Sequence, residues 1–153
     1  IRALEFYQET GRKISEHNAK EQMRTSPYNF AYFVLNDERS HLYKRIDARV
    51  DKMIEDGLEA EVRRLKEMGC TKDMVAMQGI GYKEMLSYLD GGYSLEEAVY
   101  IIKRETRHFA KRQITWFKRE RDVIWLNKNE FDYKNEAILA YMIKILKEKA
   151  IIS

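Results

Sequence analysis

The sequence predicts a mainly helical protein that also contains a few strands of a parallel sheet. Two short apolar runs, FAYFVL at residues 30–35 within the segment 29–35 and VIWL at 123–126, are typical of strands buried on both faces. Helical periodicity marks the segments 38–55, 58–68, 82–89, 94–121 and 136–149. Because two strands alone do not make a stable sheet, we expect the other strands to come from sequence outside this chain.

The start of the chain points the same way. The first ten residues have helical periodicity with no N-cap residue before them, and Gly11 is a natural helix stop. We therefore expect this chain to be a piece of a longer protein. The polar segment 11–28, which holds the only proline, Pro27, is predicted to be a loop or linker.

Composition limits the classes of protein. With 153 residues, 44% of them hydrophobic, the chain can fill the core of one domain. Cys70 is the only cysteine, which excludes an internal disulfide and suits a reducing cytoplasm. No apolar run approaches the roughly 20 residues of a membrane span, so no membrane partner is expected. The net charge of +3 is mild, and basicity is therefore a local feature.

That basicity is concentrated in the predicted helix 94–121. It begins with a capping box, Ser94 three residues before Glu97, and residues 103–121 hold eight Lys and Arg against two Glu. At about 100° per residue, the apolar side chains share one side and the cations the other. The apolar side contains Leu95, Val99, Ile102, Phe109, Ala110, Trp116 and Phe117, and the polar side contains Tyr100, Lys103, Arg104, Arg107, His108, Lys111, Arg112, Lys118 and Arg119. Such a face is either a docking site for phosphates or an ordinary solvated surface.

A second candidate site lies in the predicted helix 38–55, with Asp37 as its expected N-cap. Leu42, Ile46, Arg49 and Met53 follow one another at helical spacing, so Arg49 is predicted to point into a core-facing stripe. A buried guanidinium needs an anion, because an unpaired buried charge is very costly. Two readings stay open: a bound phosphate, in a pocket that Arg45 would widen, or a structural ion pair.

The third candidate is the segment MQGIGYKE at residues 77–84. Gly79 and Gly81 allow close approach of the backbone, and Gln78 offers the donor and acceptor needed to read a base edge. A helix-to-helix connection is the alternative. The spacing does not match the dinucleotide-binding fingerprint, and the sequence contains no Walker-type loop or nucleophile elbow.

Together these stretches resemble the C-terminal half of bacterial tRNA dimethylallyltransferases, also called tRNA isopentenyltransferases. The matching stretches, in the family's order, are IRALEFYQETG at 1–11, RIDARVDKMIEDGLEAEVRRL at 45–65, MQGIGYKEM at 77–85 and TRHFAKRQITWFKR at 106–119. The resemblance implies the C-terminal portion of an α/β fold similar to P-loop kinases, with a helical insertion. Residues 1–28 would end that insertion, residues 29–127 would belong to the catalytic core, and residues 128–153 would form a C-terminal helix.

The resemblance also implies a reaction. The family moves a dimethylallyl group from dimethylallyl diphosphate to the exocyclic amine of the adenosine 3′ of the tRNA anticodon, with Mg²⁺ as cofactor. Arg49 would contact the diphosphate, and the tRNA anticodon stem-loop would contact Asp73, Gln78, Arg104, Arg107, His108, Lys111 and Arg112. The family's phosphate-binding loop and general-base aspartate would lie upstream of Ile1, and the Mg²⁺ ligands would lie outside this chain.

We therefore expect a cytoplasmic enzyme, monomeric when full length, of which this chain alone does not catalyse the transfer. The alternative is a non-catalytic helical RNA-binding module in which Arg49 is structural.

Overall fold

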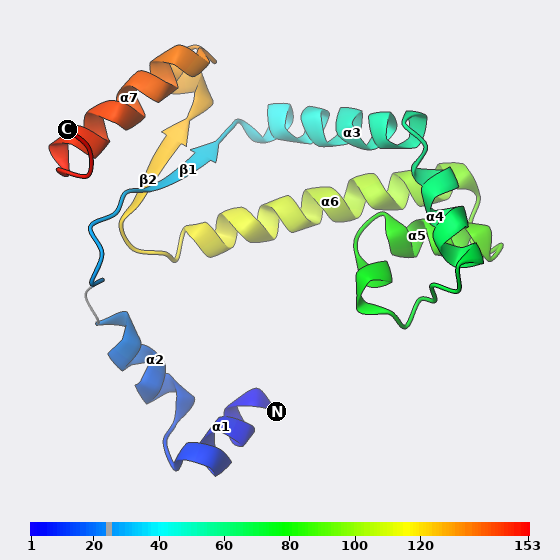
Figure 1. Cartoon of the computed structure of the whole chain (residues 1–153), viewed down its shortest axis with the longest axis horizontal. Coiled ribbons are helices and arrows are strands. Elements are labelled where there is room, and N and C mark those ends of the chain that lie inside the picture. Colours follow the sequence, from blue (N-terminus) through cyan, green and yellow to red (C-terminus); the bar gives the residue numbers. More distant parts are fainter. Residues whose placement is uncertain (24–25) are drawn as a thin grey trace.

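The computed structural model describes residues 1–23 and 26–153 and is mostly helical (Figure 1). Two long helices, α3 (Arg39–Glu55) and α6 (Leu95–Phe117), lie side by side. A two-stranded sheet and α7 (Asn135–Glu148) stand at one end of this pair, and the short helices α4 (Leu58–Glu67) and α5 (Tyr82–Leu89) stand at the other. The predicted fold class, mainly helical with a few strands, is thus confirmed. The relation to P-loop kinases stays a prediction.

The sheet consists of β1 (Tyr32–Asn36) and β2 (Val123–Asn127), which pair in parallel from Tyr32 opposite Val123 to Asn36 opposite Asn127. Asn36 Nδ2 donates a hydrogen bond of 2.9 Å to Asn127 Oδ1 at the carboxyl end of the pair. Both strands were predicted, but their burial on both faces is wrong for the described part of the chain. Val34 and Leu126 are buried, whereas Leu35 is 62% exposed.

The main core lies at the opposite end of the molecule. It joins α3, α4, α5, α6 and the 3₁₀ turn η1 (Val75–Gln78) through the buried side chains Val50, Leu58, Val62, Met77, Met85, Leu86, Ala98 and Ile102. Burying side chains of this kind contributes about 1.5–3 kcal/mol each. The turn between η1 and α5 is therefore anchored to α6.

The long helix begins as predicted. Ser94 Oγ accepts a hydrogen bond of 3.2 Å from the Glu97 backbone N–H, and Glu97 Oε2 accepts one of 2.8 Å from the Ser94 N–H. The hydrogen bond from the Ser94 backbone N–H, followed by one from the Ser94 side chain, lowers the pKa of the Glu97 carboxyl group. The helix ends at Phe117 rather than Arg121, and the chain then turns into β2 through Asp122 at φ 60°.

Two local predictions are wrong. The segment 11–28, predicted to be a loop, contains a helix, α2 (Ile14–Gln22). It follows α1 (Arg2–Thr10) after Gly11, which has a left-handed conformation. Residues 24 and 25 of the predicted loop lie outside the described residues. The sequence of α2 has too few apolar residues to show a stripe, although Phe6 of α1 packs against His17 of α2. The N-cap of α3 is Glu38 rather than Asp37.

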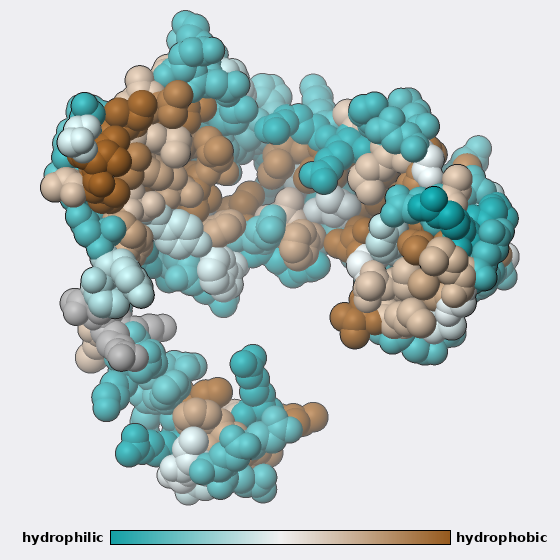
Figure 2. All heavy atoms as spheres, in the orientation of Figure 1, coloured by the Kyte–Doolittle hydropathy of each residue, from teal (hydrophilic) through white to brown (hydrophobic). Residues whose placement is uncertain are grey.

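The 3₁₀ turn η2 (Lys128–Phe131) connects β2 to α7, which was predicted at 136–149. Asn29 Nδ2 donates a hydrogen bond of 2.6 Å to the Lys149 carbonyl, which joins the end of α7 to the chain before β1. Apolar residues gather over α7 in Figure 2. Those that stay exposed among the described residues of this region are Leu139, Tyr141, Ile143 and Ile152.

Candidate nucleic-acid interface

The apolar side of α6 is covered only in its first half. Ala98 and Ile102 pack against Met85 and Leu86 of α5 and are buried. The same side continues beyond α5, where Phe109 is 46% and Trp116 is 52% exposed. The predicted core face is therefore confirmed near the start of the helix and wrong for these two aromatic residues in the described structure.

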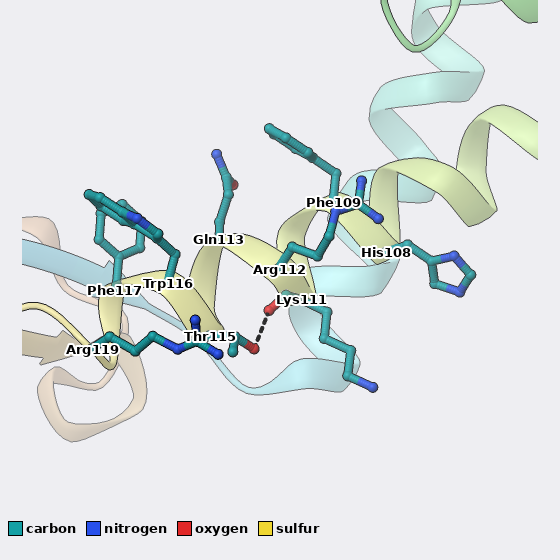
Figure 3. Close-up of a pocket in the computed structure, with 9 residues that line it drawn as sticks. All are labelled: His108, Phe109, Lys111, Arg112, Gln113, Thr115, Trp116, Phe117 and Arg119. Atoms are coloured by element: carbon teal, nitrogen blue, oxygen red, sulfur yellow. Dashed lines mark hydrogen bonds between the residues drawn. The ribbon is translucent and has the colours of Figure 1, made fainter. Parts of the chain in front are cut away.

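An open hollow of about 830 Å³ follows this second half (Figure 3). All of its lining residues come from one segment, 108–119, so it is the exposed surface of a helix and not an enclosed pocket. Figure 3 shows Phe109, Gln113 and Trp116 pointing to one side of the helix, with His108 and Lys111 on another. Aromatic rings, an amide and cations thus lie within two turns of each other.

Two of the predicted outward-facing cations instead hold α6 against α3. Arg107 Nη1 donates hydrogen bonds of 2.9 and 2.8 Å to the two carboxylate oxygens of Asp47, and its guanidinium lies 6.0 Å from the ring centre of Tyr43. One turn earlier, Lys103 Nζ lies 2.6 Å from Asp51 Oδ1. The placement of Arg107 and Lys103 away from the packing surface is therefore wrong.

The remaining predicted cations are exposed. We call Arg104, His108, Lys111 and Arg112 the basic face of α6. The side chain of Lys111 has no hydrogen-bond or ion-pair partner among residues 1–23 and 26–153. The guanidinium of Arg112 lies 5.7 Å from the ring centre of Phe109. Such uncompensated or weakly held cations are available to phosphates.

Glu105 is the acid within this face. Its Oε1 accepts a hydrogen bond of 2.9 Å from Arg104 Nε and lies 3.8 Å from His108 Nδ1. The hydrogen bond from Arg104, followed by the charges of Arg104, His108 and Lys83, lowers the pKa of the Glu105 carboxyl group. Lys83 belongs to α5 and follows the glycine turn, residues 78–81. Sequence patterns gave no signal for Lys83, because Glu105, whose pKa its charge helps to lower, is distant in the chain.

The glycine turn presents the predicted RNA-contacting residues to solvent. Met77 is 3% exposed and anchors η1 in the core, whereas Gln78, the next residue, is exposed. Asp73 is exposed in the preceding turn. The turn leads into α5, and α5 packs against α6, the helix that carries the basic face.

Arg49 is exposed, and the prediction that it points into the core is wrong. The core residue of this part of α3 is Val50, which is 2% exposed. Arg49 lies about 100° away around the helix, at the edge of the packed side. Its side chain has no hydrogen-bond or ion-pair partner in the described part of the chain, so the structural ion pair considered above is not formed there.

Arg45, one turn before Arg49, is also exposed and lies beside a polar cluster. Arg45 Nη1 is 3.7 Å from Asp37 Oδ2, and His41 Nδ1 is 2.7 Å from the Tyr133 hydroxyl. Burial, then a hydrogen bond to Asp37, raises the pKa of Tyr133. Asp37 directly follows β1, so this cluster lies at the carboxyl end of the parallel strands, where open α/β sheets bind ligands.

Within the described ranges, no three or more His, Cys, Asp or Glu side chains are grouped so that they could hold a metal ion. The resemblance implies Mg²⁺ ligands outside this chain, and the cofactor stays a prediction. None of the described helices combines the length and the apolar character needed to cross a membrane.

Known proteins match this chain over most of its length. The model of the IPP transferase family matches residues 1–120. A tRNA dimethylallyltransferase of Lachnoclostridium phytofermentans is 58% identical over 153 residues, which covers 99% of this chain and 48% of that protein.

Two crystal structures are similar as well. The tRNA isopentenylpyrophosphate transferase of Bacillus halodurans is 41% identical, with a TM-score of 0.73 over 88% of this chain and 45% of its own. The tRNA delta(2)-isopentenylpyrophosphate transferase of Staphylococcus epidermidis is 36% identical, with a TM-score of 0.76 over 96% and 47%. This chain spans about half the length of these relatives. It belongs to the IPP transferase family.

Proposed function

We propose that this chain is the C-terminal half of a tRNA dimethylallyltransferase and supplies contacts to the diphosphate and to the tRNA. The observation that carries the proposal is that α5, which follows the glycine turn, packs against α6, which carries the basic face. The cations of that face are exposed, and the turn presents Gln78. This combination offers phosphate contacts together with a side chain that can read a base edge.

The diphosphate contact is assigned to Arg49. Departure of diphosphate develops negative charge, and a guanidinium already in place stabilises that charge without reorganisation. Arg49 is exposed and unpaired in the described residues, so it does not have to break an ion pair before it meets the anion. Arg45 lies one turn away on α3 and adds positive charge on the side of the carboxyl end of β1.

The RNA contacts are assigned to Asp73, Gln78 and the basic face. The target base must leave its stack before its exocyclic amine can meet the allylic carbon. Arg104, His108, Lys111 and Arg112 would hold the phosphates on either side while the turn contacts the anticodon loop. Arg107, which was predicted to touch the tRNA, is assigned to the support of this surface because Asp47 already occupies its guanidinium.

The other half of the protein would supply the phosphate-binding loop and the general base. The coverage of about half of each relative supports this division. The exposed Phe109 and Trp116 fit a second half that packs over α6. The chain by itself would then not transfer a dimethylallyl group, and the whole enzyme would be a cytoplasmic monomer.

The test is the Arg49→Ala variant of the complete protein, with Arg64→Ala as the matched control. Arg64 is an exposed arginine on α4. If Arg49 serves the diphosphate, its removal lowers the rate of dimethylallyl transfer by about 10²-fold and leaves tRNA affinity nearly intact. The Arg64→Ala control should keep the wild-type transfer rate and the wild-type tRNA affinity. Unchanged turnover of the folded Arg49 variant would remove Arg49 from the site and favour a non-catalytic RNA-binding role for this half.

A further inference from the structure

Glu84 stands out as a buried carboxylate that the proposed chemistry does not use. It is 4% exposed and is the one charged or polar residue that is buried in the described part of the chain. Burial of a carboxylate is costly unless its oxygens are hydrogen-bonded or paired. The contacts of Glu84 therefore show what this position does.

Both oxygens of Glu84 have partners next to the glycine turn. Oε2 accepts a hydrogen bond of 2.8 Å from the Gly81 backbone N–H, and Oε1 lies 3.4 Å from Lys83 Nζ. Gly81 is the N-cap of α5, so the carboxylate lies at the positive end of the helix dipole. One side chain thus satisfies an orphan N–H donor of α5 and holds the lysine beside it.

The turn needs such a restraint. Gly81 has φ 104° and ψ −56°, a conformation that residues with a side chain rarely adopt. A Cβ at Gly81 would meet only Leu58 Cδ2, at 3.9 Å, so the backbone conformation and not lack of space requires glycine. With Gly79 two residues earlier, the backbone from Gln78 to Gly81 has unusual freedom, and the bond from Gly81 to Glu84 removes part of it.

The restrained turn also sets the positions of two exposed side chains, Gln78 and Lys83. Gln78 lies between the buried Met77 and Gly79, so its direction depends on the path of the turn. Lys83 is exposed, its Nζ lies 3.4 Å from Glu84 Oε1, and its charge helps to lower the carboxyl pKa of Glu105 on α6. Both side chains lie on the surface to which we assign the RNA contacts.

We propose that Glu84 is a positioning residue for tRNA recognition: through Gly81 it holds the turn that presents Gln78, and it pairs with Lys83 beside that turn. This inference rests on the proposed function and adds a residue that does not itself touch the tRNA or the diphosphate.

The test compares three variants of Glu84 in the complete protein. Glu84→Leu keeps the size and removes the acceptor, Glu84→Asp keeps the charge but is too short to reach the Gly81 N–H, and Glu84→Gln keeps an acceptor oxygen. Glu97→Leu is the matched control, because Glu97 makes the same 2.8 Å bond to the N-cap of α6, at the opposite end of that helix from its exposed aromatic residues. The readouts are Kd for an anticodon stem-loop, and KM for tRNA and kcat for transfer.

We expect Glu84→Leu to raise Kd and KM about tenfold, in line with loss of a buried hydrogen bond to a charged group, while kcat changes less than about twofold. Glu84→Gln should restore both constants to within about threefold of the wild type, and Glu97→Leu should leave them unchanged. If the Leu variant fails to fold, the Glu84→Asp variant tests the proposal, and we expect its KM for tRNA to be raised.

Unchanged Kd and KM in the folded Leu or Asp variant would overturn the assignment, and so would a Gln variant as weak as the Leu variant. Lys111→Gln separates this failure from that of the proposed function. If Lys111→Gln weakens stem-loop binding and Glu84→Leu does not, only the role of Glu84 is wrong. If neither variant changes binding, the RNA surface itself is misplaced.

Discussion

The ion pair between Arg107 and Asp47 should couple α6 to α3 by about 1–2 kcal/mol. Two hydrogen bonds of 2.8 and 2.9 Å join the groups, and the side chains of Arg107 and Asp47 are 25% and 35% exposed. Fully exposed pairs contribute about 0.2–1 kcal/mol, and hydrogen bonds to charged groups contribute about 1.5–3 kcal/mol. A half-buried pair in which one guanidinium nitrogen, Nη1, bonds both carboxylate oxygens should lie above the first range and near the lower end of the second once solvent screening is included.

The assay is a double-mutant cycle on the free energy of unfolding of the complete protein, measured with urea. Arg107→Met keeps the length of the side chain, Asp47→Asn keeps its shape, and the double variant closes the cycle. The control cycle uses Lys52 and Asp56, an exposed pair within α3 whose coupling should stay below about 0.5 kcal/mol. A coupling for Arg107 and Asp47 no larger than that of the control would refute the reasoning, and Arg107 would again be available for RNA.

The remaining predictions concern the core and the helix caps. Met85→Ala removes a fully buried side chain and should lower the free energy of unfolding by about 2–5 kcal/mol. The control Met68→Ala, at a residue that is 73% exposed, should change this free energy by less than about 0.5 kcal/mol. Similar losses in the two variants would show that the core is misassigned. The capping box at Ser94 predicts a pH dependence: the folded pKa of Glu97 lies below its ordinary value of 4.5, so its stabilisation is present above that value and is lost as the pH falls through the folded pKa. Urea unfolding of the wild type and of Glu97→Gln between pH 3 and 6 checks this sign, and parallel pH profiles of the two proteins would contradict it.

Local signals in the sequence predicted most of the helices and both strands. The Ser94 capping box, the stop at Gly11 and the apolar runs of β1 and β2 depend on neighbouring residues and therefore carry over to the structure. Helix α2 was missed because its residues show no apolar stripe, and propensity alone is a weak signal.

Tertiary contacts explain the errors at the site. Arg49 and Val50 are neighbours at the boundary of one stripe, and periodicity does not decide which of them meets the core. Arg107 was assigned to solvent because its acid partner, Asp47, is 60 residues away in the chain. Phe109 and Trp116 lie on the predicted apolar side, but periodicity identifies a shared face without identifying what covers it.

Resemblance and geometry contribute differently to the proposed site. The resemblance implied which segments contact the substrates, whereas the structure showed that Glu84 caps α5 at Gly81 and pairs with Lys83. The Gly81–Glu84 bond is a local contact between residues three apart, but the burial of Glu84 depends on the packing around α5 and does not follow from spacing.

The most direct test of the central claim is a salt titration of an anticodon stem-loop against the complete protein, the Lys111→Gln/Arg112→Gln variant and this chain alone. If the basic face binds the RNA, the affinity of the complete protein falls steeply with salt. The double variant should then bind more weakly, and its slope of log affinity against log salt concentration should be shallower by about one to two. Salt-dependent binding by the chain alone would place much of the RNA site on α6, and binding only by the complete protein would show that both halves share it. An unchanged slope and affinity in the double variant would contradict the account, because the basic face would then not contact the RNA.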